Sequence, residues 1–230
     1  MSKVVHRTPG LIPLESFTVF GMSAKPDSTN PIGKFGTGLK IAIAVLLRHG
    51  VEVTIHRGHE QYVFYTQKAD FRGKSFAFVR MKRRNSLLGR WTYSKLPFTT
   101  ELGKHWELWM AFRELHSNTL DENGETFVPV VNSGYGTMYA NSQPDAPQIE
   151  CTDIVVEGAA YLDCWHDRAR VFLPDGLKIR TDEEDVQVLD RASKYLYYRG
   201  LRVLDLKEEA QFTYNILREM TLTEDRTLKY

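Results

Sequence analysis

The sequence predicts an α+β fold, and three observations support this prediction. An apolar segment, Leu39–Leu47, follows a cluster of glycines and is long enough for a buried helix. Residues 51–56 and 61–66 alternate between apolar and polar side chains, and the glycine-containing segment 57–60 between them is typical of a hairpin turn. Residues 75–82 alternate in the same way. A helix followed by antiparallel strands indicates an α+β arrangement.

The composition sets limits on the class of protein. The chain has 230 residues, and 30 Lys and Arg nearly balance 29 Asp and Glu, so no bulk charge points to nucleic acid or to a membrane. The first residues lack an apolar signal core, and no apolar run reaches spanning length, which predicts a cytoplasmic protein. The two cysteines, Cys151 and Cys164, have no metal-binding spacing and are expected to be reduced.

The glycine cluster is the most informative motif. The segment Asn30–Gly38 reads N-P-I-G-K-F-G-T-G, with glycines at 33, 36 and 38. Such a loop lets the backbone approach a ligand closely, and a helix that starts behind it presents unpaired N–H groups and a positive dipole end, which suit a phosphate. The alternative is a turn that only caps a buried helix.

A second motif lies in a helix expected over residues 104–118. Glu114, Asn118 and Asp121 stand at i, i+4 and i+7 and therefore share one helix face, whereas Phe112, Leu115 and Thr119 would face the core. An amide oxygen can ligate Mg²⁺, and a carboxylate one turn away can orient or deprotonate a water. The alternative is a solvated polar face.

Taken together, the two motifs resemble the ATP-binding domain of the GHKL superfamily (gyrase, heat-shock chaperone, histidine kinase and MutL), and also bacterial and phage proteins that share its glycine box. The segment Ile32–Gly38 is similar to the glycine box of the chaperone-like members, and Glu114–Asp121 is similar to the Asn box. The resemblance implies that Glu114 is the general base and Asn118 the magnesium ligand. It also implies a nucleotide-binding set made of Gly33, Lys34, Phe35, Gly36, Thr37, Gly38, Asp121, Gly10 and Lys25.

The order of the motifs is reversed relative to the family, which suggests a circular permutation, since domain termini often lie close together at the surface. The resemblance then implies a two-layer α/β sandwich of the Bergerat type over residues 1–150, with an α+β extension over 151–230. The adenine-binding box is expected near the N-terminus, where His6 stands in place of the family's Asp and Gly10 in place of its second glycine. Asp153 and the pair Asp175-Gly176 are the other candidates for the adenine-binding Asp.

The remaining segments complete the prediction. A short helix that ends at Gly21 is expected within residues 14–25, followed by the polar run Pro26–Pro31, which the resemblance identifies as the lid over the nucleotide. Lys25 and Lys34, on either side of this run, either reach phosphates or are solvated. Further strands are expected at residues 127–131, 149–157, 168–173, 195–198 and 202–206. Further helices are expected at residues 183–195 and 208–218, and loops at 135–147 and 175–185.

The predicted function is binding of ATP and Mg²⁺ with slow hydrolysis, the nucleotide serving as a conformational switch in the cytoplasm of a bacterium or a phage-infected cell. Three alternatives remain open. The first is a degenerate, nucleotide-free module that binds a protein partner, and the second is a protein kinase on the same fold. The third is a nucleic-acid-associated factor built on the basic and aromatic segment around Arg83, although the balanced net charge argues against this partner.

Overall fold

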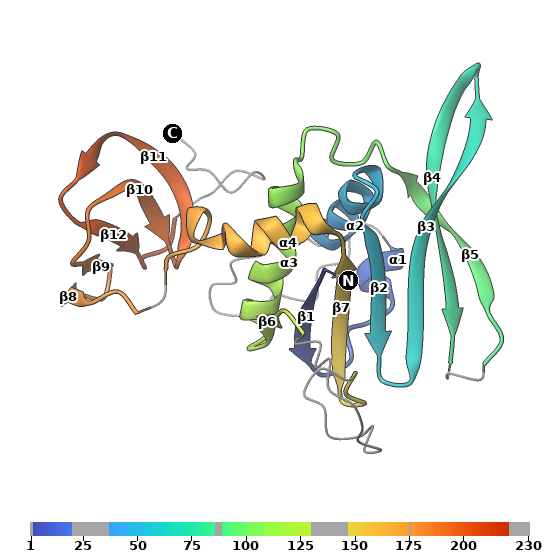
Figure 1. Ribbon diagram of the computed structural model, residues 1–230, viewed down its shortest axis with the longest axis horizontal. Coiled ribbons are helices and arrows are strands. Elements are labelled where there is room, and N and C mark those ends of the chain that lie inside the picture. Colours follow the sequence, from blue (N-terminus) through green and yellow to red (C-terminus); the bar gives the residue numbers. More distant parts are fainter. Residues whose placement is uncertain (1, 20–36, 86–88, 130–146, 175, 221–230) are drawn as a thin grey trace. The chain divides into compact units, whose positions relative to one another are not determined.

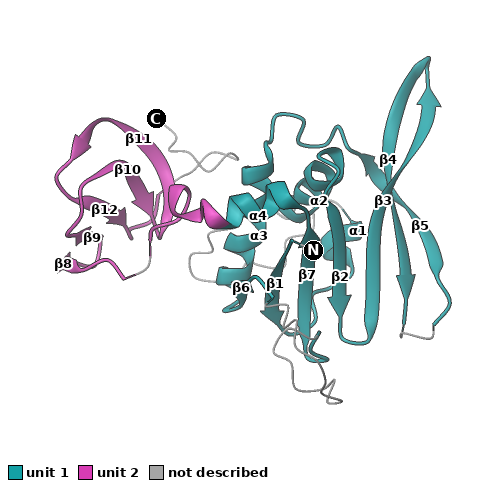
Figure 2. Ribbon diagram, in the orientation of Figure 1, with its two compact units in different colours: residues 1–165 teal, residues 166–230 magenta. Residues whose placement is uncertain are grey.

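A computed structural model describes residues 2–19, 37–85, 89–129, 147–174 and 176–220. The chain is mixed α and β and mostly strand; its described residues contain four α-helices and two sheets. It divides into two compact units, residues 1–165 and 166–230 (Figure 2). This boundary differs from the predicted one at residue 150, because the strand formed by residues 151–157 belongs to the sheet of the first unit.

The sheet of the first unit has seven strands in the order β5-β4-β3-β2-β7-β1-β6, and all neighbours are antiparallel (Figure 1). The strands are β1 (Lys3–Pro9), β2 (Glu52–Arg57), β3 (Glu60–Phe71), β4 (Lys74–Arg84), β5 (Thr92–Thr99), β6 (Glu125–Phe127) and β7 (Cys151–Glu157). The predicted hairpin and the predicted third strand are confirmed as β2, β3 and β4.

The hairpin of β3 and β4 is long, and its tip extends past the neighbouring strands (Figure 1). Arg72 and Gly73 form its turn with φ values of 49° and 75°. Two successive residues with positive φ are typical of a type I′ turn, whose twist matches that of the flanking strands.

The described α-helices are α1 (Glu15–Thr18), α2 (Gly38–Arg48), α3 (Leu108–Asp121) and α4 (Ala159–His166); the first three lie in the first unit, and α4 ends at the boundary between the units. The predicted apolar helix is confirmed as α2, and the helix predicted at residues 104–118 begins and ends later, as α3. Helix α2 ends in a Schellman motif, in which Val51 N–H donates to the Leu46 carbonyl and Gly50 N–H to the Leu47 carbonyl. Gly50 has a φ of 69°, which a glycine adopts without strain.

The core of the first unit lies between the helices and one face of the sheet. Phe17 of α1 packs edge-on against Tyr62 and Phe64 of β3, with ring centroids 5.2 and 5.9 Å apart. Helix α2 contacts β2 and β3, and its residues 41–46 are all buried. Burial on nearly every side explains why its sequence is almost continuously apolar.

The second unit is a five-stranded sheet in the order β11-β10-β12-β9-β8, with β10 and β12 parallel. Its strands are β8 (Ile179–Asp182), β9 (Val186–Leu189), β10 (Ser193–Tyr198), β11 (Leu201–Ala210) and β12 (Thr213–Ile216). The described part of this unit contains these strands and one 3₁₀ turn, Arg168–Arg170. The α+β extension was predicted over residues 151–230, a range that also includes the helix Ala159–His166.

Four predictions for segments of the second unit are wrong. Residues 183–195 form β9 and the start of β10 instead of a helix, because the alternation of Val186 and Val188 with polar neighbours suits a strand. Residues 208–218 form the end of β11 and β12, in which Thr213 and Asn215 alternate as buried side chains.

The strand predicted at residues 168–173 is a 3₁₀ turn followed by a single bridge between Phe172 and Leu201. The loop predicted at residues 175–185 includes β8, which gains its hydrogen bonds from β9. Pairing with a later strand therefore decides the structure of this segment, and a local pattern does not report such pairing.

Candidate functional site

The first turn of α2 provides the donors of the candidate site. Ile41 N–H donates to the Thr37 carbonyl at 3.1 Å, so the helix begins at Gly38. The N–H groups of the first turn, residues 38–40, have no carbonyl within the helix to bind, and they mark its positive end. Of the predicted phosphate-binding set, Thr37 and Gly38 are described. Lys25 and residues 33–36 (Gly33, Lys34, Phe35 and Gly36) lie outside the described residues.

The carboxylate of Glu114 lies directly against Gly38. Helices α2 and α3 pack together, and a β-carbon built on Gly38 would overlap the Glu114 carboxylate. Only a glycine at this position allows the carboxylate to approach the backbone so closely. The structure therefore brings together the last glycine of the predicted glycine box and the predicted general base, which are far apart in the sequence.

Asn118 lies one turn further along α3 and donates from Nδ2 to Glu114 Oε1 at 3.0 Å. Glu114 is buried, with 5% of its surface exposed, whereas Asn118 and Asp121 are half-buried. Because Asn118 uses its amide N–H₂ on the carboxylate, its amide oxygen is the atom available to a cation. Glu114, the first of the three predicted polar residues, thus places its carboxylate at the positive end of α2, where negative charge is favoured.

The opposite stripe of α3 is in the core, as predicted. Phe112, Leu115 and Thr119 are at most 1% exposed, and the Thr119 hydroxyl donates to the Leu115 carbonyl at 2.8 Å. At Glu114 the polar face of α3 is not solvated, because this side chain is as inaccessible as core residues are, whereas Asn118 and Asp121 are partly exposed.

Lys40 is a residue of this region that the sequence motifs did not identify. It is fully buried in the first turn of α2, and its Nζ donates to the Ser16 carbonyl of α1 at 2.8 Å. Burial lowers the pKa of the Lys40 ammonium. A lysine between Leu39 and Ile41 in an otherwise apolar run is the only signal in the sequence for this contact.

The N-terminal segment expected to bind adenine is the strand β1. His6, in place of the family's Asp, is fully buried and accepts or donates hydrogen bonds at Tyr161 Oη (2.7 Å) and Thr126 Oγ1 (3.0 Å). Burial, together with the nearby His116, holds the pKa of His6 well below its usual value. Both ring nitrogens of His6 are therefore hydrogen-bonded within the protein interior.

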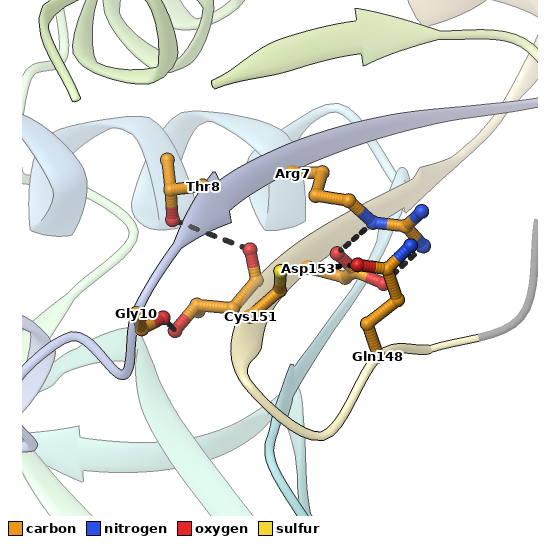
Figure 3. Close-up of polar contacts among 7 residues, drawn as sticks. Arg7, Thr8, Gly10, Gln148, Cys151 and Asp153 are labelled. Carbon is orange, nitrogen blue, oxygen red and sulfur yellow. Dashed lines mark hydrogen bonds and ion pairs between the residues drawn. The ribbon is translucent and has the colours of Figure 1, made fainter. Parts of the chain in front are cut away.

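Gly10 and Asp153, two other residues considered for adenine, lie directly after β1 and on the neighbouring strand β7, respectively. Gly10 has a φ of 81°, and its N–H donates to the Glu150 carbonyl at 2.8 Å. Asp153 is 2% exposed and accepts two hydrogen bonds from Arg7, each of 2.8 Å, so that both carboxylate oxygens are engaged (Figure 3). The third candidate, Asp175, lies outside the described residues.

The described residues offer little other ligand chemistry. Among them, no three His, Cys, Asp or Glu side chains gather as a metal site, so a magnesium role in this region depends on Asn118. Cys151 and Cys164 are half-buried free thiols. A cavity of about 240 Å³ lies in the second unit, beside Ser193, Tyr195 and Thr213. No helix within the described ranges is long and apolar enough to cross a bilayer.

Comparisons of the chain with protein-family models, with curated proteins and with solved structures give no match. The functional argument therefore depends on the residues and on their geometry.

Proposed function

We propose that the first unit binds ATP and Mg²⁺ at the start of α2 and hydrolyses the nucleotide slowly, so that nucleotide binding acts as a conformational switch. In this proposal the unit is a permuted Bergerat-like two-layer domain. The observation that carries the proposal is the approach of Glu114 to Gly38, which supports a shared pocket for the two motifs. The proposed site requires these two segments to meet, although they are distant in the chain.

The residues present fit a magnesium nucleotide. The donors of the first turn of α2, residues 38–40, suit phosphate oxygens, and Lys34 and Lys25 would add positive charge. The amide oxygen of Asn118 is a hard ligand of the kind that Mg²⁺ prefers. Bound Mg²⁺ would offset the phosphate charge beside Glu114.

Glu114 would serve as the general base for the attacking water. Its hydrogen bond from Asn118 fixes the orientation of the carboxylate, and its burial keeps bulk water away from it. A positioned base of this kind contributes about a hundred- to ten-thousand-fold in rate.

A second candidate is a nucleotide-free module that binds a protein partner. The burial of His6 and the pairing of Asp153 with Arg7 favour it, because neither residue is placed to recognise an adenine amino group. The same two observations also fit a nucleotide site with weak selectivity for the base.

The experiment that tests the proposal compares two variants of α3. Glu114→Gln is expected to bind ATP with an affinity within about twofold of wild type while its turnover falls about a hundredfold or more, because a general base acts mainly on the transition state. Asn118→Ala is expected to weaken magnesium-dependent binding itself. Glu122→Ala, an exposed change at the end of the same helix, is the control and should leave both quantities unchanged.

Affinity is measured by calorimetric titration with and without Mg²⁺, and turnover by phosphate release. If neither Glu114→Gln nor Asn118→Ala changes affinity or turnover, α3 has only a structural role. Wild-type binding without turnover would instead identify a nucleotide sensor.

A further inference from the structure

Strands β4 and β5, together with Trp91 just before β5, carry a cluster of cations and aromatic rings on their outward side. We call this cluster the basic face: Arg80, Lys82, Arg84, Trp91, Tyr93 and Lys95. Strand register places these residues together, because Arg80 pairs with Lys95 and Lys82 pairs with Tyr93. Their neighbours Val79 and Met81 are buried on the core side of β4. Arg83 pairs with the buried Tyr62 and is therefore on the core side as well.

Strand β3 places no carboxylate opposite the cations of the basic face. The positions of β3 that pair with Arg80, Lys82 and Arg84 hold Tyr, Val and Gln, so no carboxylate stands opposite these cations. Arg80 and Lys95 are direct cross-strand partners of like charge, an arrangement that destabilises a sheet. Arg80 Nε is inaccessible and has no hydrogen-bond partner among the described residues. Charges held together in this way suit an anionic ligand.

The aromatic rings of the basic face add a second kind of recognition. Lys82 Nζ and Arg84 Cζ each lie 4.8 Å from the centre of the Trp91 ring, so two cations converge on one indole. Tyr93 is 69% exposed, so most of this residue is accessible to a ligand. Arg80, Lys82 and Arg84 stand at every second position of β4. Their backbones are therefore spaced by about 7 Å along the strand, since a strand rises about 3.3 Å per residue.

From these observations we infer that the basic face binds single-stranded nucleic acid: its cations contact the phosphates, and Trp91 and Tyr93 stack on bases. Stacking requires unpaired bases, which favours a single strand over a duplex. A purely acidic protein partner would match the charge but would leave the exposed rings without a role. The net charge of the chain is only +1, because acidic residues elsewhere in the chain offset the cations of the basic face. The inference is independent of the proposed nucleotide site.

The test is a fluorescence anisotropy titration of a labelled oligothymidylate of about twenty nucleotides with the full-length protein at several salt concentrations. Wild type is expected to bind saturably. The double variant Lys82→Gln/Lys95→Gln should bind more weakly and reduce the slope of log K against log salt by about 1.4, since each phosphate contact on a single strand contributes about 0.7. Trp91→Leu should weaken binding at least about fivefold, the lower end of the effect of losing one stacked base.

The matched control is Lys194→Gln/Lys207→Gln, which removes two exposed cations from the second unit and should leave affinity and slope unchanged. Asn118→Ala should also bind the oligonucleotide as wild type does, because it lies in the other site. Circular dichroism of each variant verifies folding. Absence of wild-type binding at low salt, equal losses in the control pair, or equally tight binding of polyglutamate would overturn the inference.

Discussion

Replacement of Gly38 by alanine tests the approach of Glu114 to the start of α2. The new β-carbon would overlap the Glu114 carboxylate, and this carboxylate is buried and held by Asn118, so it has little room to move. Overpacking of this kind is expected to cost about 1–3 kcal/mol in the free energy of unfolding. Without the overlap, alanine in a helix would instead be favoured over glycine by about 0.5–1 kcal/mol.

The double variant Gly38→Ala/Glu114→Ala separates these effects. Removal of the carboxylate removes the overlap, so Gly38→Ala should stabilise the Glu114→Ala background. The coupling between the two sites should then be the sum of both effects, about 1.5–4 kcal/mol. Urea unfolding monitored by fluorescence measures each corner of the cycle.

The control cycle uses Gly158→Ala, where a β-carbon would meet the methyl groups of Val51 at 3.3 Å and not Glu114. Gly158→Ala and Glu114→Ala should be additive within about 0.5 kcal/mol. A stabilising effect of Gly38→Ala in the wild-type background would refute the close approach, and with it the shared pocket.

The other predictions concern buried polar groups of the first unit. Because the pKa of His6 is lowered in the folded state, the unfolded chain binds an additional proton below pH 6.5; stability should therefore fall as the pH drops through this value, by up to about 1.4 kcal/mol per pH unit. Urea unfolding at pH 7 and pH 5 should show a smaller fall for His6→Gln, and an equal fall would contradict the assignment. Removal of one partner of the buried Arg7–Asp153 ion pair, as in Asp153→Leu, should cost about 3–5 kcal/mol, whereas Arg7→Leu/Asp153→Leu should recover most of that loss. Similar losses of stability in the single and double variants would show that the fold requires the charges of Arg7 and Asp153 themselves.

The parts of the fold that could be predicted from the sequence are those with local periodicity. Helix α2 and strands β2, β3 and β4 follow from runs whose apolar spacing matches their structure. The burial of Leu115 and Thr119 follows in the same way from the helical period of α3.

The parts that could not be predicted depend on contacts between distant residues. Strand β7 lies between β1 and β2, although it comes long after both in the chain, so the two compact units divide after residue 165 and not at residue 150. Strands β9 and β12 gain their structure by pairing with each other. Their alternation extends over only a few residues, so the sequence alone gives a weak signal for a strand, and the partner strand supplies the hydrogen bonds that fix it.

The candidate site shows the same division. The motifs identified Gly38, Glu114 and Asn118, and the structure places these three together. The contact of Lys40 with Ser16 and the burial of His6 could not be predicted, since each depends on an element that packs from elsewhere in the chain. A resemblance between motifs indicates which residues matter, but it does not report what else is buried around them.

Calorimetric titration of the wild-type protein with ATP, with and without Mg²⁺, tests the central claim most directly. The proposed site predicts saturable binding of one ATP per chain that requires Mg²⁺ and that is lost in a variant with valine in place of Gly38, while the control Gly158→Ala binds as wild type does. Absence of binding heat and of any thermal shift at millimolar ATP and Mg²⁺ would contradict the nucleotide site and leave the protein-interaction module as the better account.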